Sequence, residues 1–600
     1  MPDDGRQVSG DLSDPFGQSN GIDPERKAAL EKAEQFLAEN ADKLLHSVTA
    51  HHSTFTANEL HSALMDRRDW QPPELVKDVR SSHLVREAIT TGLLSDMNRV
   101  ITYPGTVYDF GDDYKTRYTT IELQTMEQQI LHAARSWSNQ PGAGVRRDTV
   151  DLALSNYRAE REAVGKKYKL EGDIEDAIRK FVEPARYRFL HGNPGAGKST
   201  VINMAVRALK QAGHSVLITA QPTQLIRTLE RESGHKAMPL HQVLETLESI
   251  RDPALAPELG LQRGGMLIVD EAAMSGTREK FRIMQVAAKH NLSIGDIGGL
   301  TQMKAIAPGD PLRAIAEDPN TRIIRLEKVL RQRKEKDKEA TLAMDEGNAK
   351  KALKNYDKRG RIKFTKDPVE QAAIAYTEWR VKPINDGKRG VMFTLDRKVN
   401  HKANQLARKH LKEAGYLSDG VTIQTHDGER EFSLQDRVLF RETITPDQSM
   451  SGGRITKGAV GTIEAIGPNH MTVLIDGEDS PVTIKVNEGI RLNHAYSLTL
   501  SQPEPPAWEE GHMMDSPQGG ALDSTFPIIT RELDHPQANV MITRHQRAMT
   551  LFVDKRVYKD LDALAKDASH FEPEVTALAL ANWRKRDAND TGPAPGGTRT

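Results

Sequence analysis

The chain has 600 residues, which is too long for a single hydrophobic core and indicates three or four domains. Its net charge of −1 means that any basic surface must be local, and its lack of cysteine excludes disulfides, thiolate zinc sites and cysteine nucleophiles. We expect a cytoplasmic protein without a membrane span, because the first residues are polar and no run of about 18 apolar residues occurs.

Two terminal segments, residues 1–25 and 565–600, have compositions that cannot bury a core. The first is polar and acidic, and the second ends in DANDTGPAPGGTRT, so both are predicted to be disordered tails. Residues 26–180 show a helical pattern, with short helices such as ANELHSALM and ELQTMEQQILHAA broken by polar turns. This pattern predicts a helical N-terminal domain.

Residues 181–320 alternate apolar strands with helical segments. The strand YRFLH precedes a glycine loop and a helix, and SVLITA, MLIVDEA and LSIGD are further strands. Such alternation predicts a parallel sheet covered by helices on both faces.

A second α/β domain is predicted in two parts, residues 321–420 and 491–564. Residues 421–490, between them, carry short β-type runs with glycine or Asp-Gly turns, which predict a small inserted β-barrel. The helical segment RKVNHKANQLARKHLK (397–412) in the first part has six Lys or Arg and no acidic residue. Its basic face is either solvated or tracks a nucleic-acid backbone.

The glycine loop fits the pattern G-x-x-x-x-G-K-[ST] completely. Its backbone N–H groups and the following helix N-terminus are suited to hold phosphate oxygens. Lys198 is expected to reach the β- and γ-phosphates of ATP, and the Ser199 hydroxyl to ligate Mg²⁺. A glycine-rich turn without a ligand would explain neither the lysine nor the hydroxyl. The predicted nucleotide-binding residues are Gly192, Asn193, Pro194, Gly195, Ala196, Gly197, Lys198, Ser199 and Thr200.

Two adjacent carboxylates, Asp270 and Glu271, follow the apolar strand MLIV about 70 residues after the loop. Most Asp-Glu pairs of this kind are plain strand ends. After a phosphate loop in a parallel sheet, the pair instead predicts that Asp270 joins the Mg²⁺ shell and that Glu271 polarises the attacking water.

The order of GNPGAGKST, AQPTQLIRTL (220–229), DEAAM (270–274), LRQR (330–333) and ITRHQRA (542–548) resembles superfamily 1 DNA helicases of the RecD-like branch. Within that branch the chain is similar to the helicase part of TraA-type conjugative-transfer relaxases over about residues 40–560, without their nuclease motif. The resemblance implies an α/β fold with two RecA-like P-loop NTPase domains, an inserted SH3-type β-barrel and a helical N-terminal domain.

The resemblance also implies roles for further residues. Gln302 matches the glutamine that senses the γ-phosphate, and Arg331 and Arg544 match two arginines that reach it from the second RecA-like domain. Taken alone, each arginine would more often be a surface ion pair. Pro222 and Thr223 match a motif that contacts single-stranded DNA, although a Pro-Thr after a strand is otherwise an ordinary turn.

The chain departs from the helicase pattern at several points. Ile174 stands where the family has an adenine-reading glutamine, and three extra residues separate Gly295-Asp296 from Gln302. The fifth motif, HAYSLTLSQPEP (494–505), is shortened and has Pro503 where a glycine is usual. These departures affect base recognition and DNA coupling more than triphosphate hydrolysis.

The leading hypothesis is an ATP-hydrolysing DNA helicase or translocase that uses Mg²⁺ and moves 5′ to 3′ on single-stranded DNA or at a junction with duplex. Its setting would be conjugative transfer or related DNA processing, with DNA-transfer or replication proteins as partners. The alternative is a DNA-binding ATPase or scaffolding paralogue that binds nucleotide without unwinding. A small-molecule kinase or transport ATPase is a third reading, and it predicts no role for Arg331 or Arg544.

Overall fold

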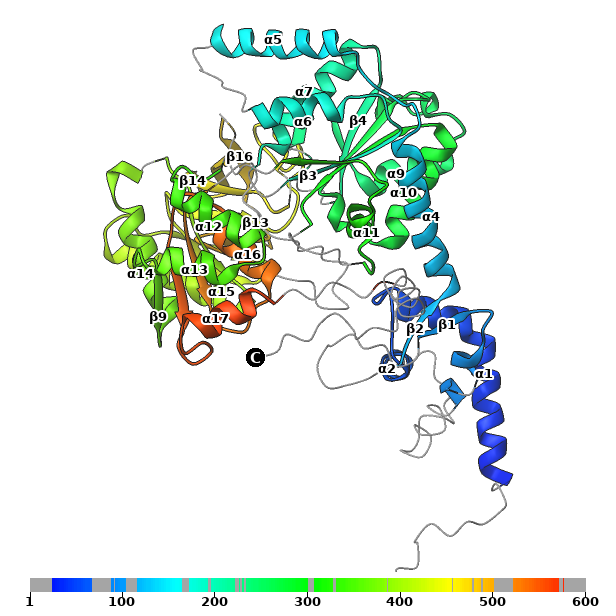
Figure 1. Cartoon of the computed structure of the whole chain (residues 1–600). Coiled ribbons are helices and arrows are strands. Elements are labelled where there is room, and N and C mark those ends of the chain that lie inside the picture. Colours follow the sequence, from blue (N-terminus) through cyan, green and yellow to red (C-terminus); the bar gives the residue numbers. More distant parts are fainter. Residues whose placement is uncertain are drawn as a thin grey trace, which may run out of the picture. The chain divides into compact units, whose positions relative to one another are not determined.

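A computed structural model describes most of the chain (Figure 1), which divides into two compact units between Gln124 and Thr125. Among the described residues, no helix combines the length and apolar character that crossing a bilayer requires. The described residues are 24–66, 88–90, 92–103, 116–163, 172–192, 196–221, 226, 229–230, 234–300, 307–326, 331–385, 387–455, 457–476, 478, 480–486, 489–500, 522–570 and 576.

The first unit is built on a long helix, α1 (Pro24–Thr49), whose apolar side chains recur at helical spacing and pack against α2 (Ala57–Asp66). The second helix starts with a capping box, because the Thr56 hydroxyl accepts from the Glu59 N–H at 3.2 Å while the Glu59 carboxylate accepts from the Thr56 N–H. The remaining elements are η2 (Leu93–Ser95) and an antiparallel pair, β1 (Val100–Tyr103) and β2 (Arg117–Thr120).

Six strands of the second unit form a wholly parallel sheet. They are β3 (Tyr187–Gly192), β4 (Val216–Ala220), β5 (Ala237–Pro239), β6 (Met266–Asp270), β7 (Ser293–Gly298) and β8 (Ile323–Leu326). Their order is β5-β4-β6-β7-β3-β8. Neighbouring residues of one strand face opposite cores: Leu217 joins one cluster and Ile218 the other. A parallel sheet buried on both faces is therefore confirmed here.

Helices cover both faces of this sheet. One core includes α5 (Arg147–Ala163), α6 (Gly172–Phe181) and α7 (Lys198–Gln211). The other includes α4 (Ile121–Ser138), α9 (Leu240–Ser249), α10 (Thr277–His290) and α11 (Pro311–Glu317). The connections include η3 (Pro253–Leu255), η4 (Pro257–Leu259) and η5 (Ala272–Met274).

The predicted domain boundary at residue 180 differs from the packing of these helices. Ile130 of α4, Val150 of α5 and Ile178 of α6 are buried in the two cores of the first sheet. Their apolar faces need the sheet for burial, so residues 125–180 pack with it instead of forming part of a separate helical domain.

A second parallel sheet has the order β18-β10-β19-β21-β9, with β20 paired to β19. Its strands are β9 (Ile362–Thr365), β10 (Gly390–Thr394), β18 (Ser497–Thr499), β19 (Leu522–Ile529), β20 (His545–Met549) and β21 (Leu551–Asp554). Its helices are α12 (Glu335–Asp345), α13 (Ala349–Asp357), α14 (Pro368–Arg380), α15 (Arg397–Glu413), α16 (His535–Thr543) and α17 (Leu561–Ala568), with η6 (Pro383–Asn385) after α14.

The helix α17 extends past the predicted start of the C-terminal tail at residue 565. Ala565 and Ala568 are buried in the core that α17 shares with α12, α13 and α16, which explains why the helix continues to Ala568. The predicted tail at residues 1–25 lies outside the described residues, apart from the start of α1.

An antiparallel β segment is inserted between α15 and β18. A hairpin of β11 (Val421–Thr425) and β12 (Gly428–Phe432) precedes a five-stranded sheet with the order β16-β15-β14-β13-β17. The insertion has an apolar core of its own. The strands of the larger sheet are β13 (Arg437–Phe440), β14 (Val460–Ile466), β15 (His470–Ile475), β16 (Val482–Lys485) and β17 (Leu492–His494).

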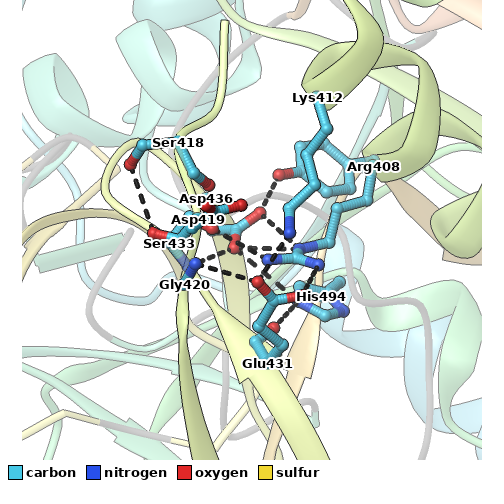
Figure 2. A network of polar contacts seen from close by, with 10 residues as sticks. Arg408, Lys412, Ser418, Asp419, Gly420, Glu431, Ser433, Asp436 and His494 are labelled. Atoms are coloured by element: carbon cyan, nitrogen blue, oxygen red, sulfur yellow. Dashed lines mark hydrogen bonds and ion pairs between the residues drawn. The ribbon is translucent and has the colours of Figure 1, made fainter. Parts of the chain in front are cut away.

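A network of charged side chains joins the inserted segment to α15 (Figure 2). The Arg408 guanidinium donates to Asp436 at 3.1 Å and to Glu431 at 3.0 Å, and Lys412 donates to Glu431 at 2.6 Å. Hydrogen bonds from Lys412 and Arg408 lower the pKa of Glu431 to about 2. The Tyr496 hydroxyl also donates to Asp436. Two of the six basic residues predicted on this helix are therefore used inside the protein.

Removing Arg408 is expected to destabilise the second unit strongly. Asp436 is fully buried, so Arg408→Ala leaves a buried carboxylate without its main cation and should lower the free energy of unfolding by about 3 kcal/mol. Lys409→Ala is a matched control, because Lys409 is exposed and pairs with the exposed Glu413 on the same helix. Urea unfolding of both variants measures the difference, and equal small losses would contradict the account.

Candidate nucleotide-binding site

The loop between β3 and α7 is shaped by glycine. Gly197 has φ of 95°, a left-handed conformation that favours glycine, and α7 begins at the next residue, Lys198. A Cβ at Gly192 would lie 3.1 Å from Lys198 Cγ and 3.3 Å from Leu326 Cβ, so a larger residue would displace the lysine. Asn193, Pro194 and Gly195 lie outside the described residues.

Lys198 folds back over the start of the loop. Its ammonium group donates to the carbonyl of Gly192 at 2.9 Å. Ala196 is buried, whereas Ser199 and Thr200 in the first turn of α7 are half-buried. The helix N-terminus and the lysine place positive charge at one point, as binding of a phosphate requires.

Further cations surround the carboxyl end of β3. Burial, together with the charges of Arg325, Lys198 and Arg313, lowers the pKa of His191 to about 4. Arg325 is the register partner of His191 on the neighbouring strand β8. The imidazole is therefore neutral at pH 7, and the electrostatic field around it favours an anion.

Asp270 and Glu271 lie at the carboxyl end of β6, which is separated from β3 by the single strand β7. Asp270 is the last residue of β6 and is 9% exposed. Glu271 has φ of 49°, a left-handed conformation that is costly for a residue with a side chain. Such strain at a strand end is typical of functional positions.

Ser199 and Asp270 have the donor chemistry that Mg²⁺ requires. Magnesium is usually bound by one or two carboxylates together with substrate phosphates, not by an all-protein cage. No cluster of three or more His, Cys, Asp or Glu suited to a metal occurs among the described residues. A hydroxyl and one carboxylate near the phosphate loop fit this type of site.

The aspartate of the predicted Gly-Asp motif, Asp296, interacts with other buried side chains. Asp296 on β7 is fully buried, forms an ion pair with Lys280 and accepts a hydrogen bond from the Tyr187 hydroxyl at 2.6 Å. This buried network ties β7 to β3 and to α10. Gln302, the predicted γ-phosphate sensor, lies outside the described residues, as do Pro222 and Thr223.

The segments that carry the two predicted arginines are held together. Gln332, next to Arg331, donates its side-chain amide to the carbonyl of Thr543, next to Arg544, at 2.8 Å. The backbone N–H of Arg333 also donates to the carbonyl of Gln546 at 2.9 Å. The structure thus brings together two arginine segments that are about 210 residues apart.

Arg544 interacts with one of the predicted catalytic carboxylates. It follows the last residue of α16. Burial lowers the pKa of its guanidinium, and the charge of Glu271 acts in the opposite direction. A residue at the end of a helix of the second sheet is therefore within electrostatic range of the carboxylate that follows β6 of the first.

Sequence patterns did not single out Asp345, the last residue of α12. Its carboxylate is 8% exposed and accepts a hydrogen bond from Asn539 at 2.9 Å. Burial raises its pKa to about 6, although Asn539, Lys198 and Arg331 lower it. In the sequence Asp345 is only an acid at a helix end, so no local signal could reveal its interaction with the phosphate-loop lysine.

Replacing Asp345 is expected to change how stability depends on pH. Because the folded protein holds the Asp345 proton more tightly than the unfolded chain, the stability contributed by this group is lost as pH rises from about 4 through about 6. Asp345→Asn keeps an oxygen acceptor for Asn539 and removes the charge. It should raise the free energy of unfolding at pH 8 by up to about 3 kcal/mol, with less gain at pH 5.

Urea unfolding at pH 5 and pH 8 tests this expectation. Asp357→Asn, at an exposed position on α13, is the control and should show little gain at either pH. An equal gain for Asp345→Asn at both pH values would contradict the raised pKa.

Ile174, which replaces the adenine-reading glutamine, is 3% exposed and belongs to the core on the α6 and α7 side of the first sheet. An apolar side chain packed in this way makes no hydrogen bond to a base. This position therefore offers no polar group with which to read a base.

The chain is similar to several known proteins. Residues 169–367 match the AAA domain family, which covers the first parallel sheet and the start of the second. The chain is 24% identical over 570 residues to the conjugal transfer protein TraA of Rhizobium radiobacter, covering 94% of this chain and 47% of that protein. It is also 24% identical to TraA of Agrobacterium fabrum, over 78% of this chain and 39% of that protein. These matches confirm the resemblance predicted from the motifs.

The chain spans about half the length of the curated relatives it matches. Among solved structures, Bacteroides Pif1 bound to ssDNA matches with 13% identity and a TM-score of 0.41, over 70% of this chain and 98% of that one. Pif1 helicase from Candida albicans matches with 13% identity and a TM-score of 0.40, over 70% of this chain and 100% of that one.

Proposed function

We propose that the chain is an ATP-dependent DNA helicase or translocase, which hydrolyses ATP to move on single-stranded DNA in the 5′ to 3′ direction. The observation that carries the proposal is that the two arginine segments are held together, with Gln332 donating to the carbonyl of Thr543 at 2.8 Å, while the charge of Glu271 acts on Arg544. A kinase or simple transport ATPase needs no arginine from a second parallel sheet beside its water-activating carboxylate. A motor does, because such an arginine makes hydrolysis depend on the closure of two domains.

The proposed roles follow the chemistry of each side chain. Lys198 and the amides of the loop hold the β- and γ-phosphates, while Ser199 and Asp270 bind Mg²⁺. Glu271 orients and polarises the attacking water. Arg331, Arg544 and Gln302 sense the γ-phosphate, so its loss on hydrolysis loosens the contact between the two domains.

The inserted segment, residues 421–490, is proposed to be an SH3-type β-barrel on the DNA side of the second RecA-like domain. The names of the TraA relatives support a setting in conjugal transfer. A single strand or a single-strand/duplex junction of DNA is the proposed substrate. DNA-transfer or replication proteins are the expected partners.

Strand displacement tests the proposal directly. Duplexes with a 5′ or a 3′ single-stranded tail are incubated with the chain, ATP and Mg²⁺, and release of the labelled strand is measured. Release from the 5′-tailed substrate alone is expected. ATP turnover without release from either substrate would favour the alternative, a DNA-binding ATPase that does not unwind.

A further inference from the structure

The carboxylate of Asp337 is buried among basic side chains. Asp337 lies in the first turn of α12, its side chain is 0% exposed, and it accepts a hydrogen bond from the Arg359 guanidinium. It also lies 3.9 Å from a guanidinium nitrogen of Arg361 and 3.8 Å from Nε2 of His545. Burial acts to raise the pKa of Asp337, but His545 and Arg359 lower it to about 2, so the carboxylate is charged at pH 7. The two arginines supply the positive charge that a buried carboxylate requires.

His545 contacts this carboxylate without neutralising it. The imidazole is fully buried, and burial lowers its pKa although Asp337 raises it, so the ring is neutral at pH 7. The ring also meets the Tyr356 ring of α13 edge-on, with the centroids 5.9 Å apart. The Arg359 guanidinium lies over the same tyrosine ring, 4.8 Å from its centroid. His545 is therefore held between α12 and α13, and its contact with Asp337 fixes its place instead of its charge.

The second sheet alone does not set the direction of Arg544. This residue lies between the end of α16 and the start of β20. Leu522 of β19 pairs with His545, but the register then shifts before Ser524, which leaves a bulge in the pair. A bulge interrupts the ladder, and bulges beside active sites re-aim side chains. Contacts from outside the sheet are therefore needed to hold the backbone at this point.

The segment that begins α12 supplies such contacts on both sides of Arg544. Before it, the carbonyl of Thr543 accepts from the side-chain amide of Gln332 at 2.8 Å. After it, the carbonyl of Gln546 accepts from the backbone N–H of Arg333 at 2.9 Å. The contact between Asp337 and His545 adds a side-chain interaction at the residue directly after Arg544. One short segment, 332–337, thus holds the neighbours of this arginine.

The other end of α12 is joined to α16 by different bonds. Nε2 of His535 donates to the carbonyl of Met344 at 2.7 Å, and Asn539 donates to Asp345 at 2.9 Å. Because these bonds already join the two helices, an apolar side chain at position 337 could complete the packing. A buried ion pair costs desolvation, but its directional contacts can fix one geometry where apolar packing allows several. The geometry fixed by Asp337 is that of the residue next to Arg544.

We propose that Asp337 is a positioning residue for ATP hydrolysis, which acts through His545 to set the direction in which Arg544 extends from the end of α16. The proposal rests on the role proposed for Arg544 under the proposed function. It adds a residue that is too deeply buried to touch the nucleotide and that no sequence motif indicates. Arg359 and Arg361 serve it by keeping the carboxylate charged.

The test measures kcat and KM for ATP in the full chain with Mg²⁺ and saturating oligo-dT. Asp337→Asn is expected to lower kcat about 10- to 100-fold, because a small misplacement of a catalytic group is costly. KM should change less than about threefold, since Lys198 and the phosphate loop are untouched. Asp554→Asn is the matched control: Asp554 is also buried in the second sheet and pairs with Arg556 at 2.6 Å. It should change kcat less than about twofold.

A double variant separates positioning from a general loss of structure. Single-turnover hydrolysis is measured for Arg544→Ala with and without Asp337→Asn. If Asp337 acts through Arg544, the second substitution should lower the rate less than about twofold further. A further loss as large as in the parent chain would overturn the proposal. Hydrolysis by Arg544→Ala at the parent rate would instead refute the role proposed for Arg544, and the positioning role with it.

A second variant keeps the test decisive if Asp337→Asn does not fold. His545→Phe retains a ring against Tyr356 and removes the polar contact with Asp337, which keeps both of its arginines. Circular dichroism establishes that the variant is folded before rates are compared. We expect kcat to fall at least about 10-fold with KM unchanged. If Arg544→Ala is impaired while folded His545→Phe turns over at the rate of the Asp554→Asn control, the positioning role alone is overturned.

Discussion

Glu271→Gln is expected to lower ATP turnover by about 10²–10⁴-fold while nucleotide binding changes by less than about threefold. The amide keeps the size and polarity of the carboxylate but cannot accept a proton from the attacking water. The strained φ of 49° at Glu271 is backbone geometry that glutamine can also adopt, so the fold should survive. Single-turnover hydrolysis and fluorescent-nucleotide binding measure the two quantities separately.

Two further variants make this result specific. Glu245→Gln, at an exposed position on α9, removes a carboxylate of the same type and should leave turnover unchanged. Lys198→Ala should lose both turnover and tight binding, because the lysine contacts the phosphates themselves. Hydrolysis by Glu271→Gln at the parent rate would mean that another group activates the water.

Arg544→Ala is expected to lower turnover by about 10³-fold or more, the range measured for arginines that stabilise a phosphoryl-transfer transition state. Nucleotide binding should persist, because Lys198 and the loop amides lie on the first sheet. Arg544→Lys should not restore activity, since an ammonium group lacks the planar, forked geometry of a guanidinium. The measurement is kcat for ATP with saturating single-stranded DNA.

Arg547→Ala provides the matched control for Arg544. Arg547 is only three residues away, is 42% exposed and pairs with Asp523 at 2.9 Å. It should change turnover by less than about twofold. Equal losses for the two variants would indicate a general effect on this segment instead of a role for Arg544 in catalysis.

The fold could be predicted where each element carries its own signal. The buried strands of the first sheet are continuous apolar runs, such as MLIV before Asp270, and the alternation with helices predicts parallel pairing. The place of β7 between β3 and β6 could not be predicted in this way. Strand order depends on how the helices pack, and no local pattern records it.

The candidate site shows the same division. The loop and Asp270-Glu271 are short, continuous motifs, so the sequence alone identifies them. The interactions of Asp345 with Lys198 and of Arg408 with Asp436 join residues that are 147 and 28 positions apart. Those electrostatic interactions arise only once the sheets and the inserted segment have folded, so spacing in the sequence cannot predict them.

The helical segment 397–412 is an intermediate case. Its periodicity correctly predicts a helix with one apolar face, because Ala403 and Ala407 are buried and Val399 and Leu406 pack beside them. The sequence could not predict how its basic residues divide. Arg408 and Lys412 face the carboxylates of the insertion, whereas Arg397 lines a pocket between α15 and the insertion.

The central claim is that hydrolysis at the phosphate loop is coupled to a single strand of DNA. The most direct measurement is the rate of ATP hydrolysis by the full chain with Mg²⁺, with and without saturating oligo-dT, beside the Arg544→Ala variant. We predict a rise of at least about 10-fold on adding DNA, and no such rise in the variant. Turnover by the unaltered chain that is the same with and without DNA would contradict the account.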